Sequence, residues 1–240
     1  MSPPLIETRG LSMRFGGVQA VRNVDFSVAE GELRCLIGPN GAGKSTFFKM
    51  LTGQLRPTSG TIFFRGADIT DLQPHEIARL GIGVKTQVPS VFNGLSVREN
   101  LWIAAARHNK GHAANLAMET QIERLSLGPF VDKLVGQLAH GQRQWVELGI
   151  VLCGAPTVIL LDEPAAGMTD DETIRTAELI KDINSTHPLI VVEHDMSFIR
   201  RIAQRITVFD RGAILTEGNV EQVFGDQTVR NIYLGKQAAA

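Results

Sequence analysis

Apolar positions along the chain follow two periods, the alternation typical of strands and the period of about 3.6 residues typical of helices. Strands rich in β-branched and aromatic residues are predicted at 5–9, 18–28, 33–37, 61–65, 82–87, 157–161, 189–193, 206–210 and 213–217. Helices are predicted at 44–53, 74–80, 96–108, 113–126, 141–153, 171–185, 196–204 and 219–225. Strands that alternate with helices in this way predict an α/β fold.

The stretch 88–155 interrupts this alternation, because it contains apolar helical patterns and no convincing strand. One of its helices has a clear start, since Ser96 and Glu99 form a capping box before an apolar run. We therefore expect a single domain over 1–240. Residues 1–87 and 156–240 would form an α/β core, and 88–155 a helical subdomain.

A phosphate-binding loop of the form G-x-x-x-x-G-K-[ST] joins the predicted strand 33–37 to the predicted helix 44–53. Its residues are Gly38, Pro39, Asn40, Gly41, Ala42, Gly43, Lys44 and Ser45, followed by Thr46. Inward-facing backbone N–H groups and the helix N-terminus bind anions in such loops. Lys44 is expected to reach the β- and γ-phosphates and the Ser45 hydroxyl to hold Mg²⁺. The chain is predicted to bind a nucleoside triphosphate.

Composition narrows the class of protein further. A formal net charge of −1 gives no electrostatic case for a nucleic-acid partner, which normally needs a basic face. No apolar run approaches the roughly 20 residues of a membrane-spanning helix, so a membrane role would come through a partner. Cys35 and Cys153 stand far apart within apolar runs and fit two reduced, buried thiols.

Two carboxylates follow the apolar run 158–161, namely Asp162 and Glu163. A fully apolar run is typical of a parallel strand buried on both faces, and the carboxyl end of such a strand faces the ligand crevice. Asp162 can hold Mg²⁺ through water, and Glu163 can polarise the attacking water. The simpler alternative is that the strand ends in a solvated turn without a functional role. The phosphate loop in the same chain favours the functional interpretation.

Three further positions carry weaker signals. His194 ends another apolar run, and a contact to the γ-phosphate is favoured over a merely solvated histidine. Gln87 ends the predicted strand 82–87, where solvation alone is the expected state of a glutamine. Residues 138–142 precede an apolar helix, and Gly141 would let an anion approach that helix N-terminus.

The order of these segments resembles the ATPase subunits of ABC transporters over nearly the whole chain. The resemblance implies a P-loop NTPase core of the ABC type, with an antiparallel β subdomain and an inserted α-helical subdomain. It implies that Phe15 stacks on adenine and that Gln87 senses Mg²⁺ and the lytic water. It further implies that Glu163 is the catalytic base and His194 the switch histidine, with ATP as substrate and Mg²⁺ as cofactor.

The segment Leu138, Ala139, His140, Gly141 and Gln142 resembles the signature sequence of this family, which closes over the nucleotide of the other subunit. The usual sequence is Leu-Ser-Gly-Gly-Gln, so Ala139 and His140 depart from it, and Ala139 offers no hydroxyl to a phosphate. A second departure is Thr169, which stands where the family usually has aspartate. Both departures concern communication between two sites and not nucleotide binding.

Within the family, segments 31–35, 138–145, 167–170 and 231–235 resemble ATPase subunits of importers for branched-chain amino acids and, more closely, for urea and short amides. The expected solute is urea or a short amide, with branched-chain amino acids as the alternative. The resemblance implies a second, non-identical ATPase subunit, two membrane permease subunits and, through them, a solute-binding protein. The chain would lie peripherally on the cytoplasmic face of the inner membrane.

Two readings of other classes compete with this one. A soluble ABC-type ATPase acting on ribosomes or DNA usually has two ATPase halves or a coiled-coil insertion, and neither is visible. A GTPase would need a guanine-reading Asn-Lys-x-Asp, and the nearest segment, 109–112, ends in histidine.

Overall fold

The centre of the molecule is a six-stranded sheet, seen in a computed structural model that describes residues 3–234. Its strand order is β10-β9-β3-β8-β7-β6, in which β9 and β10 are antiparallel and the other neighbours are parallel. The strands are β3 (Leu33–Ile37), β6 (Ile82–Lys85), β7 (Val158–Asp162), β8 (Leu189–Val192), β9 (Arg205–Asp210) and β10 (Ala213–Gly218). Gly235, which ends the segment 231–235, lies outside the described residues.

A second, antiparallel sheet covers one side of the first and has the order β2-β1-β4-β5. Its strands are β1 (Ile6–Phe15), β2 (Val18–Val28), β4 (Ser59–Phe64) and β5 (Ala67–Asp68). β1 is longer than the predicted strand 5–9 and continues past Gly10, where the pairing with β2 shifts register. This sheet is the antiparallel β subdomain that the sequence resemblance implies.

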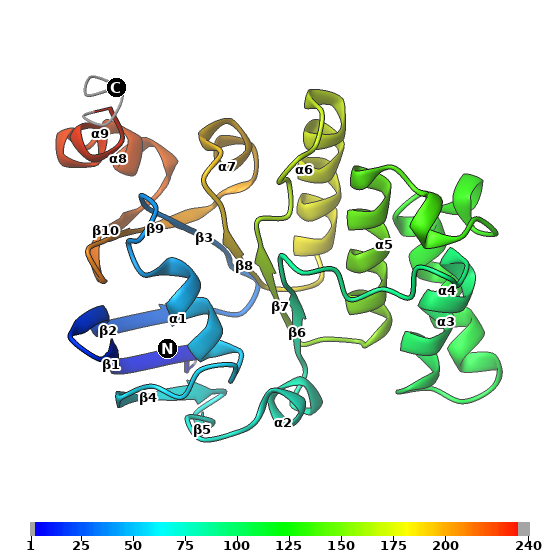
Figure 1. Cartoon of the computed structure of the whole chain (residues 1–240), viewed down its shortest axis with the longest axis horizontal. Helices are drawn as coiled ribbons and strands as arrows, with labels where there is room; N and C mark the ends of the chain where they lie inside the picture. Colours follow the sequence, from blue (N-terminus) through cyan, green and yellow to red (C-terminus); the bar gives the residue numbers. More distant parts are fainter. Residues whose placement is uncertain (1–2, 235–240) are drawn as a thin grey trace.

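The helices connect and cover these sheets (Figure 1). They are α1 (Lys44–Leu51), α2 (Pro74–Arg79), α3 (Val97–Ala106), α4 (His112–Arg124), α5 (His140–Cys153), α6 (Asp170–Asn184), α7 (Met196–Ile202), α8 (Val220–Gly225) and α9 (Gln227–Leu234). Between β6 and β7 the chain forms only α3, α4, α5 and two 3₁₀ turns, η1 (Gly128–Phe130) and η2 (Val135–Gln137). The stretch 88–155 thus contains helices and 3₁₀ turns, with one isolated β-bridge between Ser96 and Leu134.

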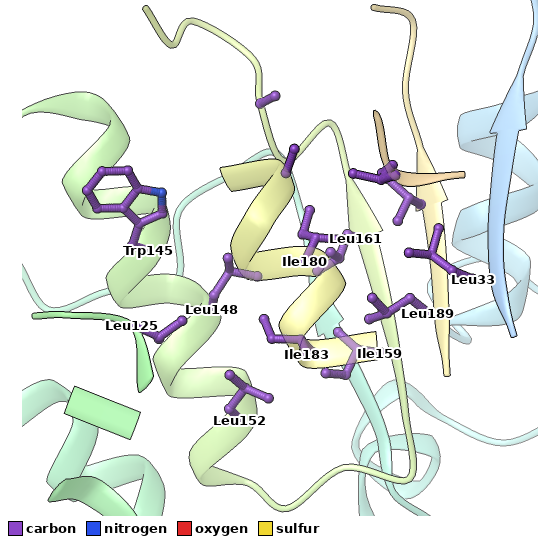
Figure 2. Close-up of a cluster of buried hydrophobic side chains, with 14 of the residues drawn as sticks. Leu33, Leu125, Trp145, Leu148, Leu152, Ile159, Leu161, Ile180, Ile183 and Leu189 are labelled. Carbon is purple, nitrogen blue, oxygen red and sulfur yellow. The ribbon is translucent and has the colours of Figure 1, made fainter. Parts of the chain in front are cut away.

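Two hydrophobic cores lie on the two faces of the six-stranded sheet. Successive residues of a strand point to opposite faces, so Cys35 packs with α5 and α6 while Leu36 packs with α1 and the antiparallel sheet. Both residues are fully buried, which explains why the central strands are apolar without alternation. Figure 2 shows α6 between α5 and the sheet, with Ile180 and Ile183 facing strand residues such as Leu161.

Candidate active site

The phosphate loop connects β3 to α1 and contacts β2 and the turn between β9 and β10. Gly43 immediately precedes α1 with a φ of 103°, and a Cβ there would lie 2.5 Å from the carbonyl oxygen of Ala20 on β2. Only glycine fits this position without moving β2. On the other side, the Gly212 backbone N–H donates to the Ala42 carbonyl at 2.9 Å. The loop backbone is therefore fixed before any ligand binds.

Lys44 folds back over this loop. Its side chain is buried, and Nζ donates to the Gly38 carbonyl at 2.6 Å and to the Pro39 carbonyl at 3.1 Å. These bonds hold the ammonium beside the loop, within a short side-chain rotation of an anion seated in it. Ser45 follows in the first turn of α1 with an exposed side chain, and Thr46 after it is half-buried.

The carboxyl ends of β7 and β8 bring Glu163 and His194 together. The strands are neighbours, and the Glu163 backbone N–H donates to the Val192 carbonyl at 2.9 Å. Glu163 Oε1 then lies 3.4 Å from His194 Nδ1. Glu163 also has a φ of 48°, an uncommon conformation for a residue with a side chain, which costs on the order of 1–3 kcal/mol. The strained turn aims this carboxylate out of the sheet edge.

Asp162, the last residue of β7, is buried next to these groups. Its Oδ1 atom has no hydrogen-bond partner among residues 3–234. Burial, and secondly the neighbouring Glu163 carboxylate, raise the pKa of Asp162 to about 6. A buried carboxylate oxygen without a donor fits a cation ligand, since a cation would supply the missing partner.

The other acidic, histidine and cysteine side chains do not form a metal cage. Within the described part of the chain, no group of three such residues could hold a metal ion by itself. A single buried carboxylate beside a phosphate loop suits Mg²⁺, which usually keeps waters and binds through one or two carboxylates plus substrate phosphates. Asp162 and the Ser45 hydroxyl are the candidate protein ligands.

Glu193 belongs to the same edge, and the sequence pattern does not single it out. The side chain is fully buried, and its carboxylate accepts from the backbone N–H groups of Ala165 at 3.2 Å and His194 at 2.8 Å. It thereby joins the loop after β7 to the loop after β8. The sequence does contain a signal that could have identified Glu193. It follows an apolar run, as Asp162 does on the preceding strand.

Gln87 and Phe15 lie at the ends of two other strands. Gln87 is exposed two residues beyond β6, the strand that pairs with β7. Phe15 ends β1 opposite Val18, and 46% of its surface is exposed. An exposed aromatic ring on a strand end, a few residues from the Ala20 that touches the phosphate loop, is available for stacking on a flat ligand.

The segment 138–142 lies elsewhere. It leads into α5, which packs on the opposite face of the sheet from α1, so one chain does not bring it against its own phosphate loop (Figure 1). Ala139 holds the N-cap position of α5 and His140 Nε2 lies 2.9 Å from the carbonyl oxygen of Ala166, in the loop after β7. Leu138 is half-buried, and Gln142 Oε1 accepts from the Ala139 backbone N–H at 3.2 Å.

Residues 21–166 match the sequence pattern of the protein family described as ABC transporter. The chain belongs to the ABC transporter family. It is 37% identical over 254 residues to the high-affinity branched-chain amino acid transport ATP-binding protein BraF of Pseudomonas aeruginosa, with 98% of this chain and 100% of that protein covered. Identity to LivG of Escherichia coli, a protein of the same description, is 35% with the same coverage.

A further relative in sequence and a solved structure also match this ABC ATPase. The lipopolysaccharide export system ATP-binding protein LptB of Acidithiobacillus ferridurans is 34% identical, with 97% of this chain and 98% of that protein covered. The ADP conformation of MJ1267, an ATP-binding cassette of an ABC transporter, superimposes with a TM-score of 0.89 at 28% identity. That superposition covers 97% of this chain and 99% of the other.

The chain is therefore an ATP-binding, ATP-hydrolysing subunit of an ABC transporter with the mixed α/β cassette fold. Between residues 3 and 234 no helix has the length and apolar character needed to cross a bilayer.

Proposed function

We propose that this chain is the energy-coupling ATPase subunit of an importer for branched-chain amino acids, seated peripherally on the cytoplasmic face of the inner membrane. The observation that carries the catalytic part is the 3.4 Å approach of Glu163 and His194 at the sheet edge that also bears the phosphate loop. A carboxylate and an imidazole there are suited to activating a water beside a γ-phosphate.

Each residue of this edge has a distinct role in the proposal. Lys44 exchanges its two carbonyl contacts for the β- and γ-phosphates of ATP. Glu163 orients the attacking water and accepts its proton, while His194 contacts the γ-phosphate. Asp162, Ser45 and Gln87 hold Mg²⁺, which when bound neutralises charge on the phosphate oxygens. Phe15 stacks on the adenine ring.

A complete site needs two ATPase subunits. Because residues 138–142 lie across the sheet from the phosphate loop of the same chain, they would close over nucleotide bound to a partner. The α5 N-terminus would then supply backbone N–H groups to the partner's γ-phosphate. The proposal includes a second, non-identical ATPase subunit, with residues 1–87 and 156–240 as the core and 88–155 as the helical subdomain.

The permease subunits would dock at a groove between the core and the helices. This groove has a volume of 450 Å³ and is lined by residues of α2, β6, α3 and α5, and by Phe92. Val88 and Phe92 are 77% and 59% exposed beside it. The Phe92 backbone is nonetheless held firmly, since its N–H and carbonyl both bond to the buried Asn100 side chain, at 2.8 and 3.0 Å. An exposed aromatic residue on a held backbone, five residues after Gln87, suits a coupling surface.

For the solute, the comparisons support branched-chain amino acids, the alternative of the sequence analysis, better than urea or short amides, which the sequence resemblance places first. BraF and LivG are both described as branched-chain amino acid transport proteins and align along their whole length. An ATPase subunit does not contact the solute. The support for branched-chain amino acids therefore comes from sequence similarity and not from a residue of this chain.

Gene deletion followed by uptake measurements tests this proposal. We expect loss of labelled leucine uptake at micromolar concentration and recovery when the wild-type gene is restored. A gene encoding Lys44→Ala should not restore uptake. Lost urea uptake with normal leucine uptake would reverse the order of solutes, and unchanged uptake of both would remove the two importers together. Permease subunits that co-purify with the chain from membranes would identify the transporter directly.

A further inference from the structure

A buried ion pair joins the last residue of β6 to the middle of α5. Lys85 and Glu147 are 3% and 5% exposed, and Lys85 Nζ lies 3.8 Å from Glu147 Oε2, which is beyond hydrogen-bond distance. Neither Lys85 Nζ nor Glu147 Oε1 has a hydrogen-bond partner in the described part of the molecule. Folded proteins rarely leave buried charged atoms in this state, so each one needs an explanation.

The pair lies where β6 and α5 pack against each other. A Cβ on Gly83 would lie 2.8 Å from Val151 Cγ1, so the α5 side chains reach the β6 backbone. Glu147 precedes Val151 by one helical turn, and Lys85 follows Gly83 by one strand repeat, so both pairs share one interface. Lys85 is also two residues from Gln87, and α5 begins with the signature segment. The Lys85–Glu147 contact therefore joins the signature helix to the strand that leads to Gln87.

The charges around Lys85 are unbalanced. Its ammonium interacts electrostatically with Glu147 and also with the buried carboxylates of Asp162 and Glu193. Glu193 already accepts backbone hydrogen bonds, whereas Asp162 Oδ1 and Glu147 Oε1 accept none. On the α5 side, Arg143 is a second cation near Glu147. Lys85 is thus one cation shared between two carboxylates, one in the core and one on the signature helix, and each has an oxygen that accepts no hydrogen bond. Lys49 is a further cation near Asp162.

We propose that Lys85 and Glu147 are positioning residues that couple the charge state of the Asp162 site to the position of α5. The inference rests on the proposed function, in which Asp162 holds Mg²⁺ with ATP. When Asp162 gains that cation, the Lys85 ammonium is repelled from the core and approaches Glu147. The contact shortens to a hydrogen-bonded ion pair and fixes α5, with His140 and Gly141 at its start, for the partner's nucleotide.

Trp145 provides a readout that does not depend on ATP hydrolysis. It lies on α5, its Nε1 donates to Thr176 Oγ1 at 2.9 Å, and the Arg175 guanidinium lies 3.9 Å from the ring centroid. Both partners are on α6, so movement of α5 relative to α6 changes the environment of the indole. Trp102 is the other tryptophan of the chain, and Trp102→Phe leaves Trp145 as the sole reporter.

The experiment titrates the full chain, in the Trp102→Phe background, with the non-hydrolysable analogue AMP-PNP in EDTA and then in Mg²⁺. The reporter protein should show a Trp145 fluorescence change in Mg²⁺ that is absent in EDTA. Lys85→Met and Glu147→Gln should each abolish the change, while the affinity for the analogue in EDTA stays within about threefold, because the pair touches no nucleotide-binding residue. Lys85→Arg should retain the change, and so should the control Glu119→Gln, on the exposed Arg98–Glu119 pair.

A double variant separates positioning from simple structural support. Lys85→Met/Glu147→Met removes both buried charges together, a replacement that is often neutral or stabilising. It should melt at or above the temperature of the reporter protein and still lack the Mg²⁺-dependent change. A Mg²⁺ response that persists in Lys85→Met or in the double variant overturns the inference. Failure of the reporter protein itself to bind the analogue would instead overturn the proposed function, so the two failures are distinguishable.

Discussion

At the scale of single residues, the function rests on Glu163. Glu163→Gln keeps the shape of the side chain but cannot accept a proton, so we expect ATP hydrolysis to fall by about 10²–10⁴-fold while ATP still binds. Unhydrolysed ATP should hold two subunits together, visible as a dimer by size-exclusion chromatography. Lys44→Ala is the matched comparison, because it should lose ATP binding itself. Turnover of Glu163→Gln within a few-fold of wild type would exclude Glu163 as the base.

The raised pKa of Asp162 indicates that its charged form, which the proposed Mg²⁺ site uses, lowers the stability of the folded chain. Its pKa is raised in the folded chain to about 6, against an ordinary value of 3.8, so the folded state binds the proton more tightly than the unfolded state does. Its contribution to stability therefore falls as pH rises from about 4 to above 6, and near pH 7 the full cost of a buried charge is present.

Asp162→Asn removes that charge, so without Mg²⁺ it should raise Tm by about 2–4 °C near pH 7, the shift that about 1 kcal/mol produces in a domain of this size. The gain should shrink as pH falls below about 6, where the wild-type carboxyl takes up its proton. Differential scanning calorimetry in EDTA at several pH values measures both effects. Equal Tm differences at every pH would contradict the raised pKa.

Phe15 should contribute to affinity without selecting the base. Phe15→Ala should weaken ATP binding by about 1–3 kcal/mol, the usual value of aromatic stacking on a base. Since any base has a face on which to stack, wild type should accept GTP with only a modest loss, measurable by isothermal titration calorimetry. Discrimination against GTP by more than about 10³-fold would show that the protein selects the base through hydrogen bonds, and would contradict recognition by stacking alone.

At the scale of elements, the loop between β6 and α3 should transmit force to the permeases. Phe92→Asp places a charge on the exposed surface of this loop and should uncouple transport while leaving basal ATPase activity intact. Because the side chain is exposed, the change in unfolding free energy should stay within about 0.5 kcal/mol. Leu116→Asp on α4, where 61% of the residue is exposed, is the matched control and should leave transport unchanged. Misfolding of Phe92→Asp would show instead that Phe92 serves the helical packing.

The elements themselves were largely predictable, because most are long and strongly patterned. The predicted strands and helices all correspond to observed elements, with ends that shift by a few residues. The second half of β1 could not be predicted, since Gly10, with a φ of 59°, and the register shift beside it interrupt the alternation. β5 is a two-residue strand, too short for a periodic signal, and no predicted helix matches α9, the last helix among residues 3–234.

The sequence singles out candidate site residues most clearly where a motif has fixed spacing. Residues 38–45 and the pair 162–163 stand out in the sequence because the chemistry needs them consecutively. Glu193, Lys85 and Glu147 do not stand out, since their roles depend on which strands are neighbours. Lys85 and Glu147 are 62 positions apart (147 − 85) and meet only because α5 packs on β6. Such pairs become visible when the sheet order is known.

At the scale of the whole molecule, the arrangement separates two halves of a site. The phosphate loop, Glu163 and His194 lie at one sheet edge, and residues 138–142 belong to a helix on the opposite face from α1. The central claim is that hydrolysis needs the first half from one subunit and the second half from another. Two variants that each damage one half can test it.

Glu163→Gln disables the first half. Ala139→Asp disables the second, because it places a negative charge at the α5 N-cap while preserving the helix, for which aspartate is a favourable cap. Each variant alone should be inactive. Without the non-identical second subunit, the isolated chain would pair with a second copy of itself. Mixed in equal amounts before ATP is added, the two variants should regain about a quarter of wild-type ATPase activity, because half of such randomly formed dimers hold one intact site of two. A mixture that stays as inactive as its components, beside an active wild type, would contradict the shared site.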